Sequence, residues 1–201
     1  MVKRDIYNYL DKILNRLAYR IYHTFQTYRK MKFDELNVIQ TTTRLYEELV
    51  TINWEAYRDI AEHYFASEPH GDGMWMWLWL EEQLRTPSPT IKYAYNTEVV
   101  RKRDRLAEAL LATGGRKPEF DKAMRYWSQM TGWFGIEVAD EALRRARVMD
   151  GVTHVMWVSE HDNRVCGTCE DYDGRVFPIE EVPPKPHPGC RCHLVRYDGR
   201  T

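Results

Sequence analysis

The placement of the cysteines constrains this chain more than any other feature of its sequence. All four lie between residues 166 and 192 of a 201-residue chain, at Cys166, Cys169, Cys190 and Cys192. Two residues separate Cys166 from Cys169, and the same spacing joins His187 to Cys190. The 17 residues between the two pairs match the ligand spacing of tetrahedral structural zinc sites. The sequence therefore predicts a metal site near the C-terminus.

This cluster offers more donors than one tetrahedral site needs. The six candidates are Cys166, Cys169, His187, Cys190, Cys192 and His193. Cys166 and Cys169 form the firmer pair. In the second half, His187 and Cys190 repeat the two-residue spacing, whereas Cys190 and Cys192 would share one side of an extended chain. We predict one structural zinc per chain, with Cys166, Cys169, His187, Cys190 and Cys192 as ligands from which sequence cannot select four. Reduced, buried cysteines or a disulfide remain alternatives.

Apolar residues recur at steps of three and four along the first 70 residues, which predicts two long amphipathic helices. The first spans residues 3–31 and the second runs from an N-cap at Asp34 to Pro69. Their stripes are Ile6, Leu10, Ile13, Leu17, Ile21, Phe25 and Tyr28, then Leu45, Leu49, Ile52, Ala56 and Ile60. Residues 1–32 hold eight Lys/Arg against two Asp/Glu, and residues 33–70 hold two against eight. These opposite charges favour an antiparallel hairpin of the two helices.

Three further helices are expected before residue 150. The apolar run 74–80 predicts a short helix that is buried in a core or against a partner. A helix opened by Pro87 and Pro89 should end at Gly114, and a long helix should run from Pro118 to about residue 150. Gly132 and Gly135 predict a kink or a close helix contact within it.

The remaining residues are rich in β-branched and aromatic side chains. Short strands are expected over 153–158, 175–179 and 192–197, with a hairpin turn at Asp173 and Gly174. About 50 residues with three short strands bury too little apolar surface to fold alone, whereas structural zinc supplies about 10–16 kcal/mol. The predicted fold is mainly α with a small α+β C-terminal module: a helical domain over 1–150 and a zinc-binding module over 151–201.

Charge and composition narrow the function classes. The net charge is -1, the pI is about 6.7, and the chain shows neither an export signal nor a membrane-spanning run. Residues 152–201 hold six Lys/Arg against eight Asp/Glu, the wrong sign for a phosphate-binding module. The order of residues in a zinc deaminase site is missing. We therefore expect no enzyme, and keep a zinc-stapled DNA-binding or nuclease-like protein as the alternative.

Residues 150–196 resemble the C-terminal signature of the Mu F-like head morphogenesis proteins. The signature consists of Trp-x3-His-Asp-x-Arg-Val-Cys-x2-Cys, an Asp-Gly-x-Val-Phe turn and a closing Pro-His-Pro-x-Cys-Arg-Cys. The matching positions are Trp157, Asp162, Arg164, Cys166, Cys169, Gly174, Pro186, His187, Pro188, Cys190, Arg191 and Cys192. The helices before residue 150 fit the family more loosely.

The resemblance implies a structural role in tailed bacteriophages. Such a minor head protein would act in capsid assembly and contact the portal protein, the scaffold or the major capsid protein. A few copies per particle, a weak contact with packaged DNA and no contact with a membrane are expected. The implied location is the virion, at the portal or inside the capsid, and the host cytoplasm during assembly.

Overall fold

The computed structural model describes residues 5–35, 37–68, 76–161, 163 and 165–199. The chain forms five long or medium helices followed by a small sheet with one short helix. The helices of the first part are α1 (Asp5–Arg29), α2 (Val38–Ala66), α3 (Met76–Arg85), α4 (Tyr95–Thr113) and α5 (Lys117–Met149). The C-terminal part contains β1 (His154–Val158), α6 (Gly167–Tyr172), β2 (Val176–Pro178), the 3-10 turn η1 (Ile179–Glu181) and β3 (His193–Arg196).

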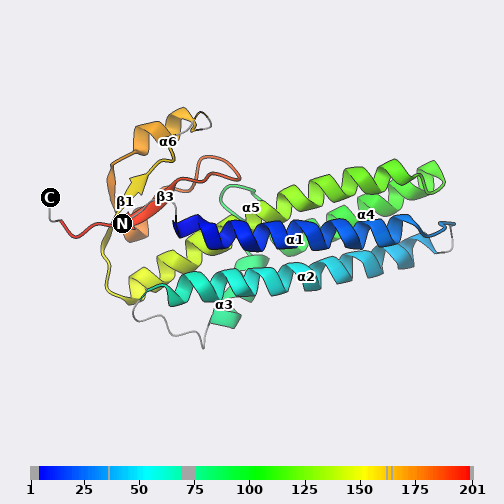
Figure 1. The fold of residues 1–201 in the computed structure, drawn as a ribbon, viewed down its shortest axis with the longest axis horizontal. Helices are drawn as coiled ribbons and strands as arrows, with labels where there is room; N and C mark the ends of the chain where they lie inside the picture. Colours follow the sequence, from blue (N-terminus) through cyan, green and yellow to red (C-terminus); the bar gives the residue numbers. More distant parts are fainter. Residues whose placement is uncertain (1–4, 36, 69–75, 162, 164, 200–201) are drawn as a thin grey trace.

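The molecule is an elongated helical bundle with the sheet at one end. Helices α1, α2 and α5 run side by side along its length (Figure 1). The start of α1 and the end of α5 both lie next to the sheet (Figure 1). Because α5 leads into β1, the last turns of this helix set the position of the C-terminal part.

The two expected N-terminal helices are confirmed. The α1 stripe from Leu10 to Phe25 is buried, and so are the five apolar α2 residues named above; the side chain of Ile6 lies outside the described part. Helix α2 begins later than expected, with Asn37 rather than Asp34 as its N-cap. Asp34 lies in the turn that precedes α2, where its carboxylate accepts a hydrogen bond of 3.0 Å from the Asn37 amide. Arg20 and Glu55 join the two helices at 2.6 Å, as their opposite charges suggest.

Helices α3 and α4 differ from expectation. Helix α3 begins at Met76, and it is not buried all round as expected, since the side chain of Leu78 is 74% exposed. Residues 69–75, which include the expected turn and the start of the apolar run, lie outside the described part. Pro87 and Pro89 lie in a loop, and α4 starts at Tyr95. Its end is as expected, since Gly114 adopts a left-handed φ of 63° and caps the helix.

Helix α5 passes close to α1 at Gly135. A Cβ atom there would lie 2.8 Å from a methyl group of Leu14, whereas one at Gly132 would meet nothing. The close contact predicted for this pair of glycines is therefore present at Gly135. The helix continues unbroken through both glycines from Lys117 to Met149.

The three expected strands form one antiparallel sheet in the order β2-β1-β3. Val155 pairs with Phe177 on one side and Arg196 on the other. Asp173 and Gly174 do not close a strand hairpin as expected. They end α6, a helix that the sequence did not reveal, and lead into β2.

Candidate metal centre

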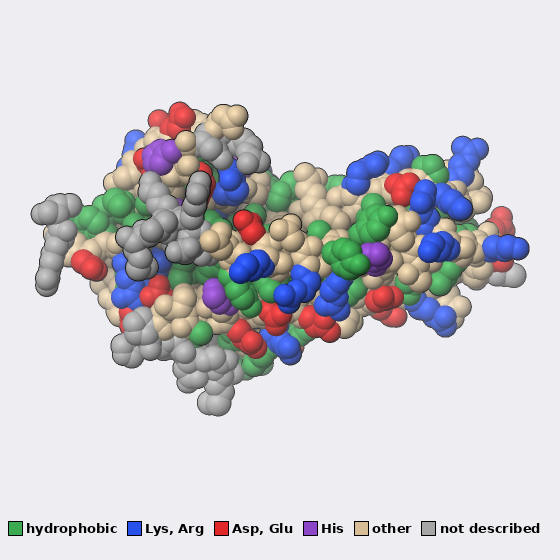
Figure 2. All heavy atoms as spheres, in the orientation of Figure 1, with side chains coloured by type: hydrophobic (Ala, Val, Ile, Leu, Met, Phe, Trp, Pro, Cys, Tyr) green, Lys and Arg blue, Asp and Glu red, His purple; other side chains and the backbone are tan. Residues whose placement is uncertain are grey.

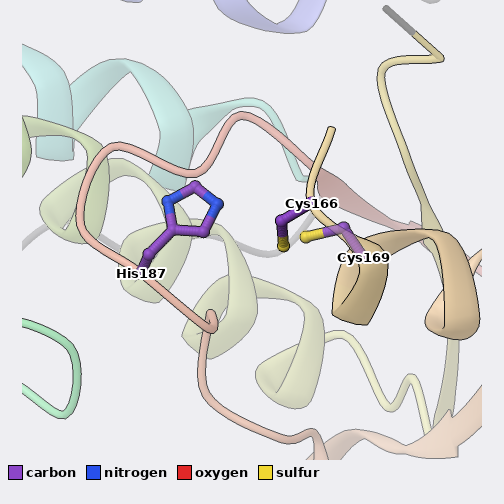
Figure 3. Close-up of side chains that lie close together, drawn as sticks. All are labelled: Cys166, Cys169 and His187. Atoms are coloured by element: carbon purple, nitrogen blue, oxygen red, sulfur yellow. The ribbon is translucent and has the colours of Figure 1, made fainter. Parts of the chain in front are cut away.

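Helix α6 brings the first pair of cysteines together. Cys166 is its N-cap and Cys169 lies in its first turn. Residues three apart on a helix share one side, so the two sulfur atoms point toward one point. Figure 3 shows both sulfur atoms facing each other, with the imidazole ring of His187 approaching from the opposite loop.

The loop between η1 and β3 supplies the other donors. His187 and Cys190 lie in a turn, in which the Cys190 amide donates a hydrogen bond of 3.3 Å to the His187 carbonyl. Gly189 allows this turn, because its φ is 75° and a Cβ atom would lie 2.9 Å from the Trp133 indole nitrogen. The same loop then enters β3 directly after Cys192.

Donor atoms of four other residues gather around the Cys169 sulfur atom. Cys166, Cys169 and His187 place one donor atom each within 4.8 Å of one another, and so do Cys169, Cys190 and Cys192. The Cys169 and Cys190 sulfur atoms are 3.4 Å apart. Two thiolates on one tetrahedral zinc ion lie about 3.8 Å apart, given Zn–S bonds of about 2.3 Å. The donor set and its spacing therefore fit a structural zinc ion, and no disulfide joins these cysteines.

The thiols are held in an apolar setting that disfavours bare negative charge. Cys169, Cys190 and Cys192 are buried, and Cys166 is half-buried. Burial raises the pKa of Cys169 far above its usual value, and contacts with the other three thiols raise it further. Burial also raises the pKa of Cys190, opposed by the nearby charge of Lys185. A bound dication removes this cost, because thiolates are its ligands.

The sixth candidate of the sequence, His193, lies outside this cluster. Its Nδ1 atom is 3.6 Å from a Glu160 carboxylate oxygen, and its ring packs edge-on against Tyr7 at 5.9 Å. Neighbouring residues of an extended chain point to opposite sides, so Cys192 faces the thiols and His193 faces away. Asp162 and Arg164, which the resemblance also singled out, lie outside the described residues.

Trp157 and Gly174 support the centre through packing and backbone hydrogen bonds. Trp157 is 2% exposed and lies in one apolar cluster with Cys169, Cys190 and Cys192. Its amide donates to the Arg175 carbonyl at 2.9 Å, and its carbonyl accepts from the Gly174 amide at 2.9 Å. Gly174 adopts a φ of 74°, which suits glycine. These contacts fix α6, and with it Cys166 and Cys169, against β1.

A polar network ties the ligand loop to the helical bundle. Lys185 pairs with Asp140 of α5 and donates a hydrogen bond of 2.9 Å to the Cys190 carbonyl. The Tyr7 hydroxyl lies 3.1 Å from Asp140 and 3.4 Å from the Cys192 carbonyl oxygen. Burial, followed by Asp140, raises the pKa of Tyr7, so the phenol keeps its proton as a donor. Sequence spacing gave no signal for these residues, because they come from three distant segments.

Arg147 makes a second link between the bundle and the sheet. Its guanidinium pairs with Glu68 at 2.9 Å and donates a hydrogen bond of 3.0 Å to the Leu194 carbonyl. The two side chains are 8% and 9% exposed, so this is a buried ion pair. Arg196 of β3 pairs with the same Glu68 and with Asp150. The end of α2, the end of α5 and β3 therefore meet at one charged junction.

A comparison with known protein families gives a match over the part of the chain that contains this centre. Residues 135–195 match the family of Phage Mu protein F like proteins. This match confirms the resemblance seen in the sequence, and it extends from the second half of α5 to β3. No curated protein and no solved structure was found to match. Among the described residues, no helix is long and apolar enough to cross a membrane.

Proposed function

We propose that this protein is a structural minor head protein of a tailed bacteriophage that acts during capsid assembly. The match of residues 135–195 to the Mu F-like family carries the proposal. These residues include every candidate metal ligand and the last turns of α5 that hold them. The role is non-enzymatic: the helical domain contacts other proteins and the C-terminal module fixes the end of the chain.

In this proposal one zinc ion per chain holds the C-terminal module together. Four of the five donors Cys166, Cys169, His187, Cys190 and Cys192 are the ligands. Zinc would replace the apolar core that this module lacks, and its chemistry here is structural rather than catalytic. Elemental analysis of the protein purified without added metal should give one zinc per chain, and a metal-free folded module would contradict the site.

Cobalt substitution tests whether His187 is one of the four ligands or all four are thiolates. Cys169 is common to both groups of donors, whereas His187 belongs to one of them. The His187 Nδ1 atom lies 3.1 Å from the Pro188 carbonyl, which would leave Nε2 for the metal. If His187 is a ligand, His187→Gln should change the cobalt absorption bands; if the site has four thiolates, Cys192→Ser should change them and His187→Gln should not.

The proposed partners are the portal protein and the scaffold or major capsid protein, with a few copies of this chain per particle. The test is to locate the protein in purified particles and to measure its binding to the portal protein of the same phage. Particles that lack the protein, together with no binding to the portal, would contradict the proposal. The protein is expected at the portal or capsid interior, and in the host cytoplasm before assembly.

A weak contact with packaged DNA is supported by one surface. Lys12 and Arg16 lie on the exposed side of α1 and Lys30 lies in the turn after it, with no ion pair to any described residue. Figure 2 shows further basic side chains over the first half of α5, while acidic ones gather along the α2 edge. Binding to DNA should fall steeply with salt and should weaken when these three residues are replaced by Gln.

A further inference from the structure

A cavity of about 360 Å³ lies where α5 faces the C-terminal module, next to the metal centre, with Trp157 and Cys192 in its wall. Its walls come from the second half of α5, the sheet, η1 and the loop 182–185. The apolar part of the wall includes Leu143, Val155, Ile179, Val182, Pro183 and Leu194. This volume lies within the range of ligand pockets, which combine apolar walls with a few convergent polar groups.

The cations in this wall are already neutralised. Each of the three has an acidic partner close by. The pairs are Lys185 with Asp140, Arg144 with Glu141, and Arg147 with Glu68. An anionic ligand would therefore have to break an existing ion pair in order to bind here.

Glu137 is the exception among the acids of the cavity. The Ser88 hydroxyl donates to its Oε1 atom at 2.6 Å, and the Thr90 hydroxyl contacts the same oxygen. Among the described residues, no cation forms an ion pair with Glu137 and no hydrogen bond is found at Oε2, although the charge of Lys185 is near enough to act on this carboxyl. A carboxylate against apolar walls is costly unless a cation or donor pairs with it. The cavity thus has a surplus of negative charge at one defined position.

We propose that this cavity receives a lysine or arginine side chain from a partner polypeptide. The cationic head would pair with Glu137, and the methylene stem would pack on Leu143 and Leu194. Arginine fits best, because its guanidinium is more weakly hydrated than an ammonium and one of its N–H groups can donate to the Oε2 atom of Glu137. This assignment rests on the proposed role as a protein that assembles with other head proteins, and it names the chemistry of one contact.

The test uses the full zinc-loaded chain and two capped tripeptides of the same shape. Acetyl-Leu-Arg-Leu-amide carries the cation, and acetyl-Leu-citrulline-Leu-amide replaces it with a neutral urea. Methyl NMR follows binding at Val155, Ile179 and Leu194. The arginine peptide should shift these methyl signals and bind roughly tenfold or more tightly than the citrulline peptide, because a charge-assisted hydrogen bond is lost in the latter.

Glu137→Gln isolates the carboxylate with little change in shape. The variant should bring the arginine peptide down to the affinity of the citrulline peptide. Glu108→Gln is the matched control, since Glu108 is exposed on α4 and away from the cavity wall. It should leave both affinities unchanged.

Three outcomes would overturn the inference. The first is equal binding of the two peptides to the wild-type chain, which needs no variant to interpret. The second is a set of shifts that maps outside the cavity or survives Glu137→Gln. The third is binding of free spermidine more tightly than of the arginine peptide, which would assign the cavity to a polyamine. None of these results bears on whether the protein is found in phage particles, so the two proposals can fail separately.

Discussion

The helical bundle and the C-terminal module are held together by different means. The bundle buries one continuous apolar cluster that draws on all five of its helices. The corresponding cluster of the module has four buried members, and three of them are the candidate ligands Cys169, Cys190 and Cys192, packed on Trp157. The bundle is stabilised by area removed from water, whereas the small cluster of the module is built around thiols that could hold a metal ion.

This difference explains why the C-terminal module has a more specific sequence pattern than the helical bundle. An apolar core needs many positions and tolerates exchange among similar side chains. A metal core needs four donors at fixed distances, and it leaves a short, specific signature. Accordingly, residues 135–195 match a family, whereas only general helical periodicity marks the residues before them.

The largest expected effect comes from removing the thiol that both donor groups share. We propose a domain boundary near residue 150, so Cys169→Ser should release the metal and unfold residues 151–201 while most helices persist. The loss within the module is on the order of 10 kcal/mol, the apparent contribution of zinc in small domains. Hydrogen exchange should show lost protection in β1 and β3 with protection retained in α2.

Ser159→Ala serves as the control for Cys169→Ser. Ser159 is also buried in the module, and its backbone amide, not its side chain, donates a hydrogen bond of 2.8 Å to the Asp173 carboxylate. This variant should keep its metal and its protection. If Cys169→Ser instead unfolds the whole chain in one step, the proposed boundary is wrong.

The buried ion pair at the junction should give the next largest effect. Arg147→Met leaves the buried Glu68 without one partner and the Leu194 carbonyl without its donor. Removing one member of a buried pair costs about 3–5 kcal/mol, here toward the lower end because Arg196 still contacts Glu68. Chemical denaturation followed by tryptophan fluorescence measures this change.

Arg145→Met is the matched control for Arg147→Met, since Arg145 lies two residues earlier on α5 and its side chain is 40% exposed. Its ion pair with Glu141 is of the surface kind, so the loss should stay within about 1 kcal/mol. Equal losses in the two variants would show that the junction does not couple the bundle to the module.

A substitution that creates a cavity in the bundle core tests whether the metal site depends on packing of the bundle. Leu49 is fully buried on α2, and Leu49→Ala should cost about 2–5 kcal/mol. The folded fraction of this variant should still bind one zinc per chain, because Leu49 lies in the apolar cluster of the bundle and the thiols lie in the other cluster. Loss of zinc from protein that remains helical would mean that the metal site depends on bundle packing at a distance.

Sequence reasoning succeeded where structure follows from local spacing. The α1 stripe at Leu17 and Ile21, the left-handed cap at Gly114 and the gathering of Cys166 with Cys169 all depend on neighbours within a few residues. Helix α6 was missed because its six residues are too few to show a period. The predicted start of α4 was wrong because Pro87 and Pro89 also suit an extended loop.

The parts that sequence could not predict depend on contacts between distant segments. Lys185 reaches Asp140 across 45 residues, and Tyr7 lies beside a carbonyl 185 residues away. Neither spacing nor composition signals such pairs. His193 appeared as a ligand candidate because sequence shows its proximity to Cys192 but not the direction of its side chain, which the pairing of β3 with β1 sets.

The smallest expected effect concerns the charge inside the cavity between the two parts. Burial raises the pKa of Glu137, opposed by hydrogen bonds from Ser88 and Thr90 and by Lys185, and aided by Asp140. A carboxyl whose folded pKa is raised stabilises the fold when protonated, and this contribution is lost as the pH rises through the folded pKa.

At pH 7, Glu137→Gln should therefore unfold with a free energy equal to that of the wild type or higher by less than about 1 kcal/mol. The gain in melting temperature should shrink as the pH falls toward about 4.3, the ordinary range for Glu. A variant that is clearly less stable than the wild type at pH 7 would mean that the Glu137 charge is favourably paired within the chain, by the Ser88 and Thr90 hydroxyls or by Lys185, and is not an open charge.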